Sequence, residues 1–292
     1  MTMTRATWLG ATLAVGVTAA TAQEPSAPPQ GEKLLADAIS WVSADPQAPA
    51  DLQLKPDDRI VALGDSITAG GGYLRYVEQV LAAQYPGLGG LRIANAGISG
   101  NKAEDMIARF DRDVLQKNPT VVSINVGIND VWHRLKNPHD EAVLRKYREN
   151  LAAMVAKAQA AGARAILLAP TVIQEDPASE GNRRLPLYVA AMREVAAERK
   201  CAFVDLHALF LEALKHKPAG RPGNWLTGDG VHMQPTGNAV MALGLLRALG
   251  VPDAKSAATA IVRPPPRKPA PPREKPQGTN QPAAHAPPGA PA

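Results

Sequence analysis

Five short apolar runs alternate with segments of helical spacing from Arg59 to Leu249. The apolar runs cover residues 59–63, 91–94, 120–126, 165–169 and 202–206, and the helical segments cover 73–84, 103–115, 141–161, 187–200 and 236–249. A short apolar run is typical of a strand that is buried on both faces, and regular alternation of strand and helix is typical of a parallel sheet covered by helices. We therefore predict an α/β fold with three layers, α/β/α, around a five-stranded, mostly parallel sheet.

Three of these runs lead into short motifs of glycine and polar residues. They are Gly64-Asp65-Ser66-Ile67-Thr68, Asn95-Ala96-Gly97 and Gly127-Ile128-Asn129-Asp130. Ligands bind open α/β sheets at the carboxyl ends of the strands, so Ser66, Gly97 and Asn129 are expected at one edge of the sheet. A fourth motif, Asp229-Gly230-Val231-His232, falls in the loop before the last helix, which is long enough to reach the same edge.

The residue types in these motifs fit nucleophilic catalysis by serine. A serine hydroxyl needs an imidazole to take its proton, and the imidazole needs a carboxylate to orient it. Asp229, three residues before His232 in a short turn, can bind Nδ1 and leave Nε2 free for Ser66. The oxyanion of the tetrahedral intermediate needs hydrogen-bond donors, and the Gly97 and Asn129 motifs are candidates for that role.

The four motifs, in this order, resemble those of the SGNH (GDSL-type) hydrolases, and the resemblance runs from about Arg59 to Leu249. It implies a flavodoxin-like SGNH hydrolase fold, with Ser66 as the nucleophile, His232 as the base and Asp229 as its orienting partner. The oxyanion donors that it implies are the N–H groups of Ser66 and Gly97 and the side-chain amide of Asn129. The serine is not in a G-x-S-x-G elbow, which argues against an ordinary α/β-hydrolase.

Each candidate also has a purely structural interpretation. Ser66 could cap the following helix, Asn129 could form an Asx-turn, and Gly97 could serve the backbone angles of its turn. Trp132 and Trp225 flank the catalytic motifs and are either a platform for a sugar ring or acyl group, or ordinary packing.

The resulting functional hypothesis is an exported serine esterase that forms an acyl-enzyme and removes short acyl groups, such as acetyl, from carbohydrate. An acyltransferase to sugar hydroxyls and a non-catalytic carbohydrate-binding module are the alternatives. The expected partner is a small-molecule or polysaccharide ester, and the chain is expected to be a monomer. No cofactor is expected, and no metal, since no pair of histidines has metal-ligand spacing.

Both ends of the chain differ from its centre. Residues 1–22 are interpreted as a signal peptide: Arg5 supplies the positive charge at its start, and Ala20-Thr21-Ala22 fits the cleavage pattern. Its apolar stretch has about 13 residues, whereas a membrane-spanning helix needs roughly 20. An uncleaved anchor is the alternative. The signal peptide predicts that the protein is secreted or periplasmic. Residues 23–58 are expected to be a linker with a leading helix over 31–42, and residues 59–252 are expected to form the catalytic domain. Residues 253–292 are expected to be a disordered tail rich in Pro and Ala.

The net charge of +5 equals the sum of the charges near the two ends of the chain. Residues 263–292 hold five basic residues and one acidic residue, and Arg5 supplies the remaining charge, so residues 6–262 are neutral when taken together. This balance gives no reason to expect a nucleic-acid groove. The basic tail is either a solvated spacer or a weak contact for an anionic envelope polymer. Cys201, the single cysteine, is expected in a buried strand and excludes an intrachain disulfide.

Overall fold

A computed structural model describes residues 53–251 and contains one five-stranded sheet, all of whose pairs are parallel, in the order β2-β1-β3-β4-β5. The strands are β1 (Ile60–Gly64), β2 (Ile93–Gly97), β3 (Val121–Asn125), β4 (Arg164–Leu168) and β5 (Ala202–Val204). This order is that of flavodoxin-like folds, in which the chain reverses direction across the sheet after β2. The predicted fold class is confirmed.

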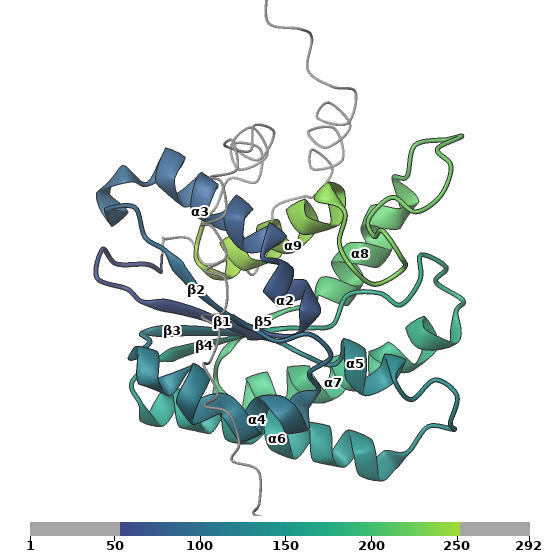
Figure 1. The fold of residues 1–292 in the computed structure, drawn as a ribbon, viewed down its shortest axis with the longest axis horizontal. Helices are drawn as coiled ribbons and strands as arrows, with labels where there is room; N and C mark the ends of the chain where they lie inside the picture. Colours follow the sequence, from purple (N-terminus) through teal and green to yellow (C-terminus); the bar gives the residue numbers. More distant parts are fainter. Residues whose placement is uncertain (1–52, 252–292) are drawn as a thin grey trace, which may run out of the picture.

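Helices cover both faces of the sheet (Figure 1). The longer helices are α3 (Gly72–Gln84), α4 (Ala103–Asp113), α6 (Glu141–Ala160), α7 (Glu180–Arg199), α8 (Leu206–Lys215) and α9 (Pro235–Ala248). Helices α3, α8 and α9 lie on one face, and α4, α6 and α7 lie on the other. Within residues 53–251, none of the helices is both long enough and apolar enough to span a membrane.

The central strands form where the sequence is apolar because both of their faces are covered, whereas the edge strands β2 and β5 are partly exposed. Every residue of β1 and β3 is buried, and β3 contributes Val121, Val122 and Ile124, whose branched side chains favour extended backbone. Helix α9 packs against α3 and α8, and its residues from Ala239 to Leu246 are all buried. The core therefore lies on both sides of the central strands.

The long helices and the five strands occur close to the residues predicted for them, and α7 differs most. It begins at Glu180, seven residues before the predicted start at Leu187, and contains Pro186 in its first half. The polar residues at its beginning hid the helical pattern, but Ser179 caps it and the buried Asn182 side chain accepts the N–H of Ile173. Tertiary contacts therefore start this helix where the hydrophobic periodicity does not.

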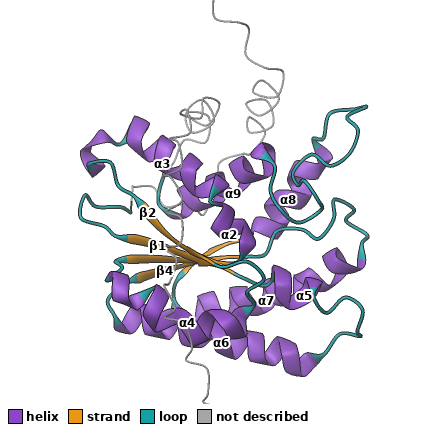
Figure 2. Cartoon of the chain, viewed as in Figure 1, coloured by secondary structure: helices purple, strands orange, loops and turns teal. Residues whose placement is uncertain are grey.

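Three of the α-helices between residues 53 and 251 were not predicted. Helix α2 (Ser66–Gly70) follows β1, and α5 (Ile128–Trp132) follows β3. Each has only five residues, which is too short to show a period in the sequence. The third, α8, has ten residues and follows β5. In Figure 2, teal loops lead from one end of the strands to these purple helices.

Several predictions fall outside the described residues. These are the signal peptide over 1–22, the leading helix over 31–42 and the tail over 253–292. Cys201 lies directly before β5 rather than within it and is partly buried. Burial raises the pKa of its thiol to about 11, so the thiol stays protonated at neutral pH.

The close packing of β2 against α2 requires a glycine at position 97. A Cβ at this position would lie 2.2 Å from the backbone nitrogen of Ala69 in α2, and a backbone atom cannot turn away. We expect Gly97→Ala to lower the free energy of unfolding by about 1–3 kcal/mol, the usual cost of overpacking. Thermal unfolding measures the loss. The control is Gly70→Ala in α2, where a Cβ meets nothing within 4 Å; equal melting temperatures for the two variants would contradict this assignment.

Candidate active site

Ser66 lies directly after the first strand. β1 ends at Gly64, Asp65 caps α2 by accepting the N–H of Ile67 at 2.9 Å, and Ser66 is the first residue of that helix. The first N–H groups of a helix have no partner within it, so the Ser66 N–H remains available at the end of the strand. Its side chain is partly buried. The β1–α2 turn thus presents both the hydroxyl and the N–H of Ser66 at the carboxyl edge of the sheet.

Ser66, His232 and Asp229 form one hydrogen-bonded chain. The distance from His232 Nε2 to Ser66 Oγ is 2.8 Å, and that from His232 Nδ1 to Asp229 Oδ2 is 2.6 Å. The other carboxylate oxygen of Asp229 accepts the N–H groups of Val231 and His232 at 3.0 and 2.8 Å. The Asp229 carboxylate therefore holds both the imidazole ring and the turn from which the ring projects.

The pKa of Asp229 is lowered to about 2. Partial desolvation acts in the opposite direction, but the hydrogen bonds from the ring and N–H of His232 and the N–H of Val231, with the charge of His232, outweigh it. The carboxylate therefore stays ionised at neutral pH, as an orienting partner of the imidazole must.

The loop that carries Asp229 and His232 is fixed by residues that follow the fourth strand. The Glu175 carboxylate accepts the backbone N–H groups of Trp225, Leu226 and Thr227, each at 2.7 Å, and the Thr227 hydroxyl at 2.9 Å. Gln174, at a φ of 63°, donates its N–H to the carbonyl of Gly230 at 2.7 Å. Neither residue was predicted from the sequence, since the partners of both lie about 50 positions away.

Asn129 lies in α5, one turn after β3, and its side chain is buried. Its amide Nδ2 donates one hydrogen to the carbonyl of Asn101 at 3.1 Å, and the amide carries a second hydrogen. Gly127, at a φ of 122°, makes the turn that leads into α5. Asn129 thus remains a candidate oxyanion donor, joined to the loop that follows β2.

The structure contradicts the predicted role of Gly97. Its backbone N–H donates to the side-chain Oδ1 of Asn95 at 2.9 Å, so this donor is used in a local Asx-type turn. Gly100, in the same loop, has a φ of 80° and is exposed, and its N–H makes no hydrogen bond to any residue in 53–251. The carbonyl of the next residue, Asn101, accepts the Asn129 amide, so Gly100 is one residue away from a contact of that candidate donor. The sequence feature that could have indicated Gly100 as a candidate donor is the second glycine in Asn95-Ala96-Gly97-Ile98-Ser99-Gly100.

Trp132 and Trp225 differ in their exposure to solvent. Trp132 is 37% exposed, and its ring meets that of His232 edge to face, with centroids 6.2 Å apart. Trp225 is 1% exposed, so the prediction that it lines the cleft is wrong. Its contribution to the site is its backbone N–H, which Glu175 binds. Trp132 alone of the two can contact a bound substrate.

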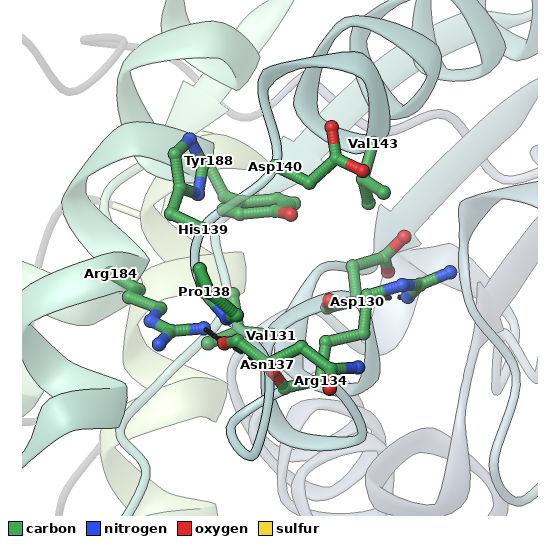
Figure 3. Close-up of a pocket in the computed structure, with 10 residues that line it drawn as sticks. All are labelled: Asp130, Val131, Arg134, Asn137, Pro138, His139, Asp140, Val143, Arg184 and Tyr188. Atoms are coloured by element: carbon green, nitrogen blue, oxygen red, sulfur yellow. Dashed lines mark hydrogen bonds between the residues drawn. The ribbon is translucent and has the colours of Figure 1, made fainter.

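Two buried carboxyl groups lie beside the site residues. Burial raises the pKa of Asp65 to about 6 and that of Asp130 to about 7, although hydrogen bonds from the N–H groups of Ile67 and Ala103, respectively, oppose the shift. Asp130 also lines the cavity in Figure 3, which has a volume of about 420 Å³ and extends to Arg134, Arg184 and Tyr188. Ser66 and His232 do not line this cavity, which lies behind α5.

Metal ligands do not cluster in the described part of the chain. No group of three or more His, Cys, Asp or Glu side chains between residues 53 and 251 is arranged to hold a metal ion. His207, for example, is buried and binds the carbonyl of Thr171 through Nδ1 at 2.5 Å.

This fold and this hydrogen-bonded triad define a class of protein. The chain belongs to the GDSL-like lipase/acylhydrolase family, whose model matches residues 62–240. It is a carboxylic ester hydrolase of the SGNH type.

Curated relatives include an acetylxylan esterase from Geobacillus stearothermophilus, 32% identical over 218 residues, which are 68% of this chain and 97% of the relative. Esterase TesA from Pseudomonas aeruginosa is 28% identical over 180 residues, 59% of this chain and 78% of that protein.

Solved structures of hydrolases share the fold of this chain. The crystal structure of the Geobacillus stearothermophilus acetylxylan esterase Axe2 superposes with a TM-score of 0.61, covering 68% of this chain and 97% of that one. Its catalytic mutants replace a serine, an aspartate and a histidine, and the last two are three residues apart, as Asp229 and His232 are. LAE5, an α/β hydrolase from the Lake Arreo metagenome, is 28% identical with a TM-score of 0.61 and covers 69% of this chain and 99% of its own.

Asp130 generates the second prediction, a pH-dependent stability. Because its folded pKa of about 7 lies above the unfolded value, the folded state binds the proton more tightly, and stability is lost as the pH rises from about 4 to about 7. Asp130→Asn cannot ionise but keeps an acceptor for the Ala103 N–H. We expect the melting temperature of the variant, relative to the unsubstituted protein, to be higher at pH 8 than at pH 4.

The control is Gln116→Ala, at an exposed position whose amide side chain does not titrate. Its effect on the melting temperature should be similar at both pH values. Equal effects of Asp130→Asn at pH 4 and pH 8 would contradict the assignment.

Proposed function

We propose that this chain is an exported serine esterase that removes short acyl groups, such as acetyl, from carbohydrate through an acyl-enzyme. The observation that carries the proposal is the continuous chain from Ser66 Oγ to His232 to Asp229, with distances of 2.8 and 2.6 Å. The acetylxylan esterase relative, matched over almost its whole length, supports acetylated carbohydrate as the substrate class. Export rests on the predicted signal peptide over residues 1–22.

In the proposed reaction, His232 Nε2 takes the hydroxyl proton of Ser66 while Oγ bonds to the carbonyl carbon of the ester. The carbonyl electron pair moves to oxygen and forms the oxyanion. When the pair returns, the C–O bond to the sugar breaks, and the sugar oxygen takes the proton from Nε2. Water then repeats the sequence on the acyl-enzyme, releasing the carboxylic acid and restoring Ser66. Throughout, Asp229 accepts the Nδ1 proton of His232 in a hydrogen bond.

Three donors are proposed for the oxyanion: the N–H of Ser66, the N–H of Gly100 and the free amide hydrogen of Asn129. Gly100 replaces Gly97 in this assignment because the Gly97 N–H already binds Asn95. Donors fixed before the reaction stabilise the developing negative charge without a cost of reorganisation.

The surroundings of the triad support a large alcohol group. The side chains of His232 and Asp229 are 44% and 55% exposed, so a sugar chain can approach them from solvent. Trp132 and Ile98 are two of the three exposed large apolar side chains in the described structure. Trp132 is in α5 with Asn129, and Ile98 is in the loop after β2 with Gly100. A flat apolar surface such as the Trp132 ring suits the face of a sugar ring, and we propose it as the carbohydrate platform.

The third prediction tests the nucleophile and the acyl group. The mature protein should hydrolyse p-nitrophenyl acetate faster than the butyrate, and the butyrate faster than the octanoate. Ser66→Ala should abolish all three activities, because no other hydroxyl in residues 53–251 is hydrogen-bonded to His232 Nε2. Release of acetate from acetylated xylo-oligosaccharides, measured by chromatography, tests the carbohydrate.

Folded protein without Ser66-dependent turnover would contradict the esterase, and transfer of the acetyl group to an added sugar in preference to water would favour the acyltransferase. A rate that rises with acyl length would contradict the short-acyl assignment.

The fourth prediction concerns Asn129. Loss of an oxyanion donor typically lowers kcat by about 10²–10³-fold, and we expect this for Asn129→Ala, with KM changing much less. The exposed Asn137→Ala is the matched control and should leave kcat unchanged. If Asn129→Ala lost activity only in proportion to the unfolded fraction seen by circular dichroism, the residue would be structural.

A further inference from the structure

Arg109 is a buried arginine whose guanidinium group connects the segments that carry the candidate oxyanion donors. It lies in the middle of α4 and is only 7% exposed. Its Nη2 donates to the carbonyl of Gly64 at 3.0 Å, and its Nη1 donates to the carbonyl of Ala96 at 2.9 Å. Its Nε donates to the side-chain Oδ1 of Asn101 at 2.6 Å. One planar cation thus binds the end of β1, the end of β2 and the loop after β2.

Each of these acceptors is close in sequence to a proposed donor. Gly64 is two residues before Ser66, and Asn101 directly follows Gly100. The same Asn101 accepts the Asn129 amide on its backbone carbonyl at 3.1 Å, so the third donor is connected to Arg109 through one residue. Arg109 is therefore linked by short covalent or hydrogen-bonded paths to all three proposed donors.

The chemistry of the contact requires arginine. Its guanidinium group carries five N–H donors in a rigid plane, whereas lysine carries a compact ammonium that cannot span three separate acceptors with the same geometry. A buried cation is costly unless it is paired and hydrogen-bonded, and Asp113, one helical turn later, meets Nη1 at 3.0 Å. The charge is therefore compensated while the remaining donors are directed to the ends of the two strands.

We propose that Arg109 is the positioning residue of the oxyanion hole: it fixes the spacing of the Ser66 N–H, the Gly100 N–H and the Asn129 amide without touching the substrate. This inference rests on the proposed function, because it assigns a role within the same site. Donors that bind the oxyanion act more strongly on the transition state than on the bound ester, so misplacing them lowers kcat more than it changes KM.

The experiment compares Arg109→Lys with Arg112→Lys. Both arginines lie in α4 and pair with Asp113, but Arg112 is 67% exposed and has no contact with Gly64, Ala96 or Asn101 in the described structure. We expect Arg109→Lys to lower kcat on p-nitrophenyl acetate by about 10–100-fold, as a displacement of about 1 Å in a catalytic group can do, with KM within about twofold of the unsubstituted value. Arg112→Lys should change neither constant.

A double-mutant cycle separates positioning from general destabilisation. Residues that act through one another are non-additive, so the Arg109→Lys effect on kcat should be much smaller in the Asn129→Ala background. Rates are divided by the active enzyme measured from the end point of a p-nitrophenyl phosphonate titration, which removes any unfolded fraction. An equal effect in both backgrounds, or an unchanged kcat in Arg109→Lys, would overturn the proposal.

If Arg109→Lys does not fold, Asn101→Ala provides the second test, since it removes one acceptor of the guanidinium and leaves the backbone carbonyl that binds Asn129. It should lower kcat at nearly constant KM, and an unchanged kcat would overturn the proposal. Failure of the proposed function itself would appear differently, as absence of Ser66-dependent turnover in the unsubstituted protein.

Discussion

The parallel pairing of β1 with β2 and β3 is the constraint on which the site depends. Gly64 pairs with Gly97, and Leu63 pairs with Ile124, so three strands end side by side at a spacing of about 4.8 Å. The first turn beyond each strand carries Ser66, Gly100 or Asn129. The ladder hydrogen bonds and the complete burial of β1 and β3 hold this register. The sheet itself therefore determines the separation of the nucleophile from its candidate donors.

The triad combines this sheet edge with a loop from the far end of the domain. Glu175 and Gln174, after β4, bind the loop that carries Asp229 and His232 through its backbone. Arg109 binds the ends of β1 and β2 in a similar way, through their carbonyl groups. The hydrogen bond between Ser66 and His232 joins the two regions. Charged side chains that bind backbone groups, rather than the reacting atoms, thus account for much of the order of the site.

The sequence was sufficient for features that depend on local pattern and insufficient for those that depend on tertiary contacts. The five strands and most long helices follow from hydrophobic periodicity. Ser66 and Asn129 follow from motifs at strand ends, and Asp229 and His232 follow from the motif in the loop before the last helix. Gly97 was predicted as a donor because the spacing of a motif does not reveal that the Asn95 side chain accepts its N–H. Glu175 binds Trp225 and Thr227, 50 and 52 positions away, and Arg109 binds Gly64, 45 positions away, so only the folded chain shows these contacts. The burial of Trp225 likewise depends on the folded chain.

The most direct test of the account is the site at which a p-nitrophenyl phosphonate labels the enzyme. The reagent leaves a stable adduct on a serine that an imidazole activates and an oxyanion hole faces. We predict release of one equivalent of p-nitrophenol per folded chain, complete loss of esterase activity, and an adduct located by mass spectrometry on the peptide that contains Ser66. Full inactivation with the label on any other residue, or retention of activity after Ser66 is labelled, would contradict the account.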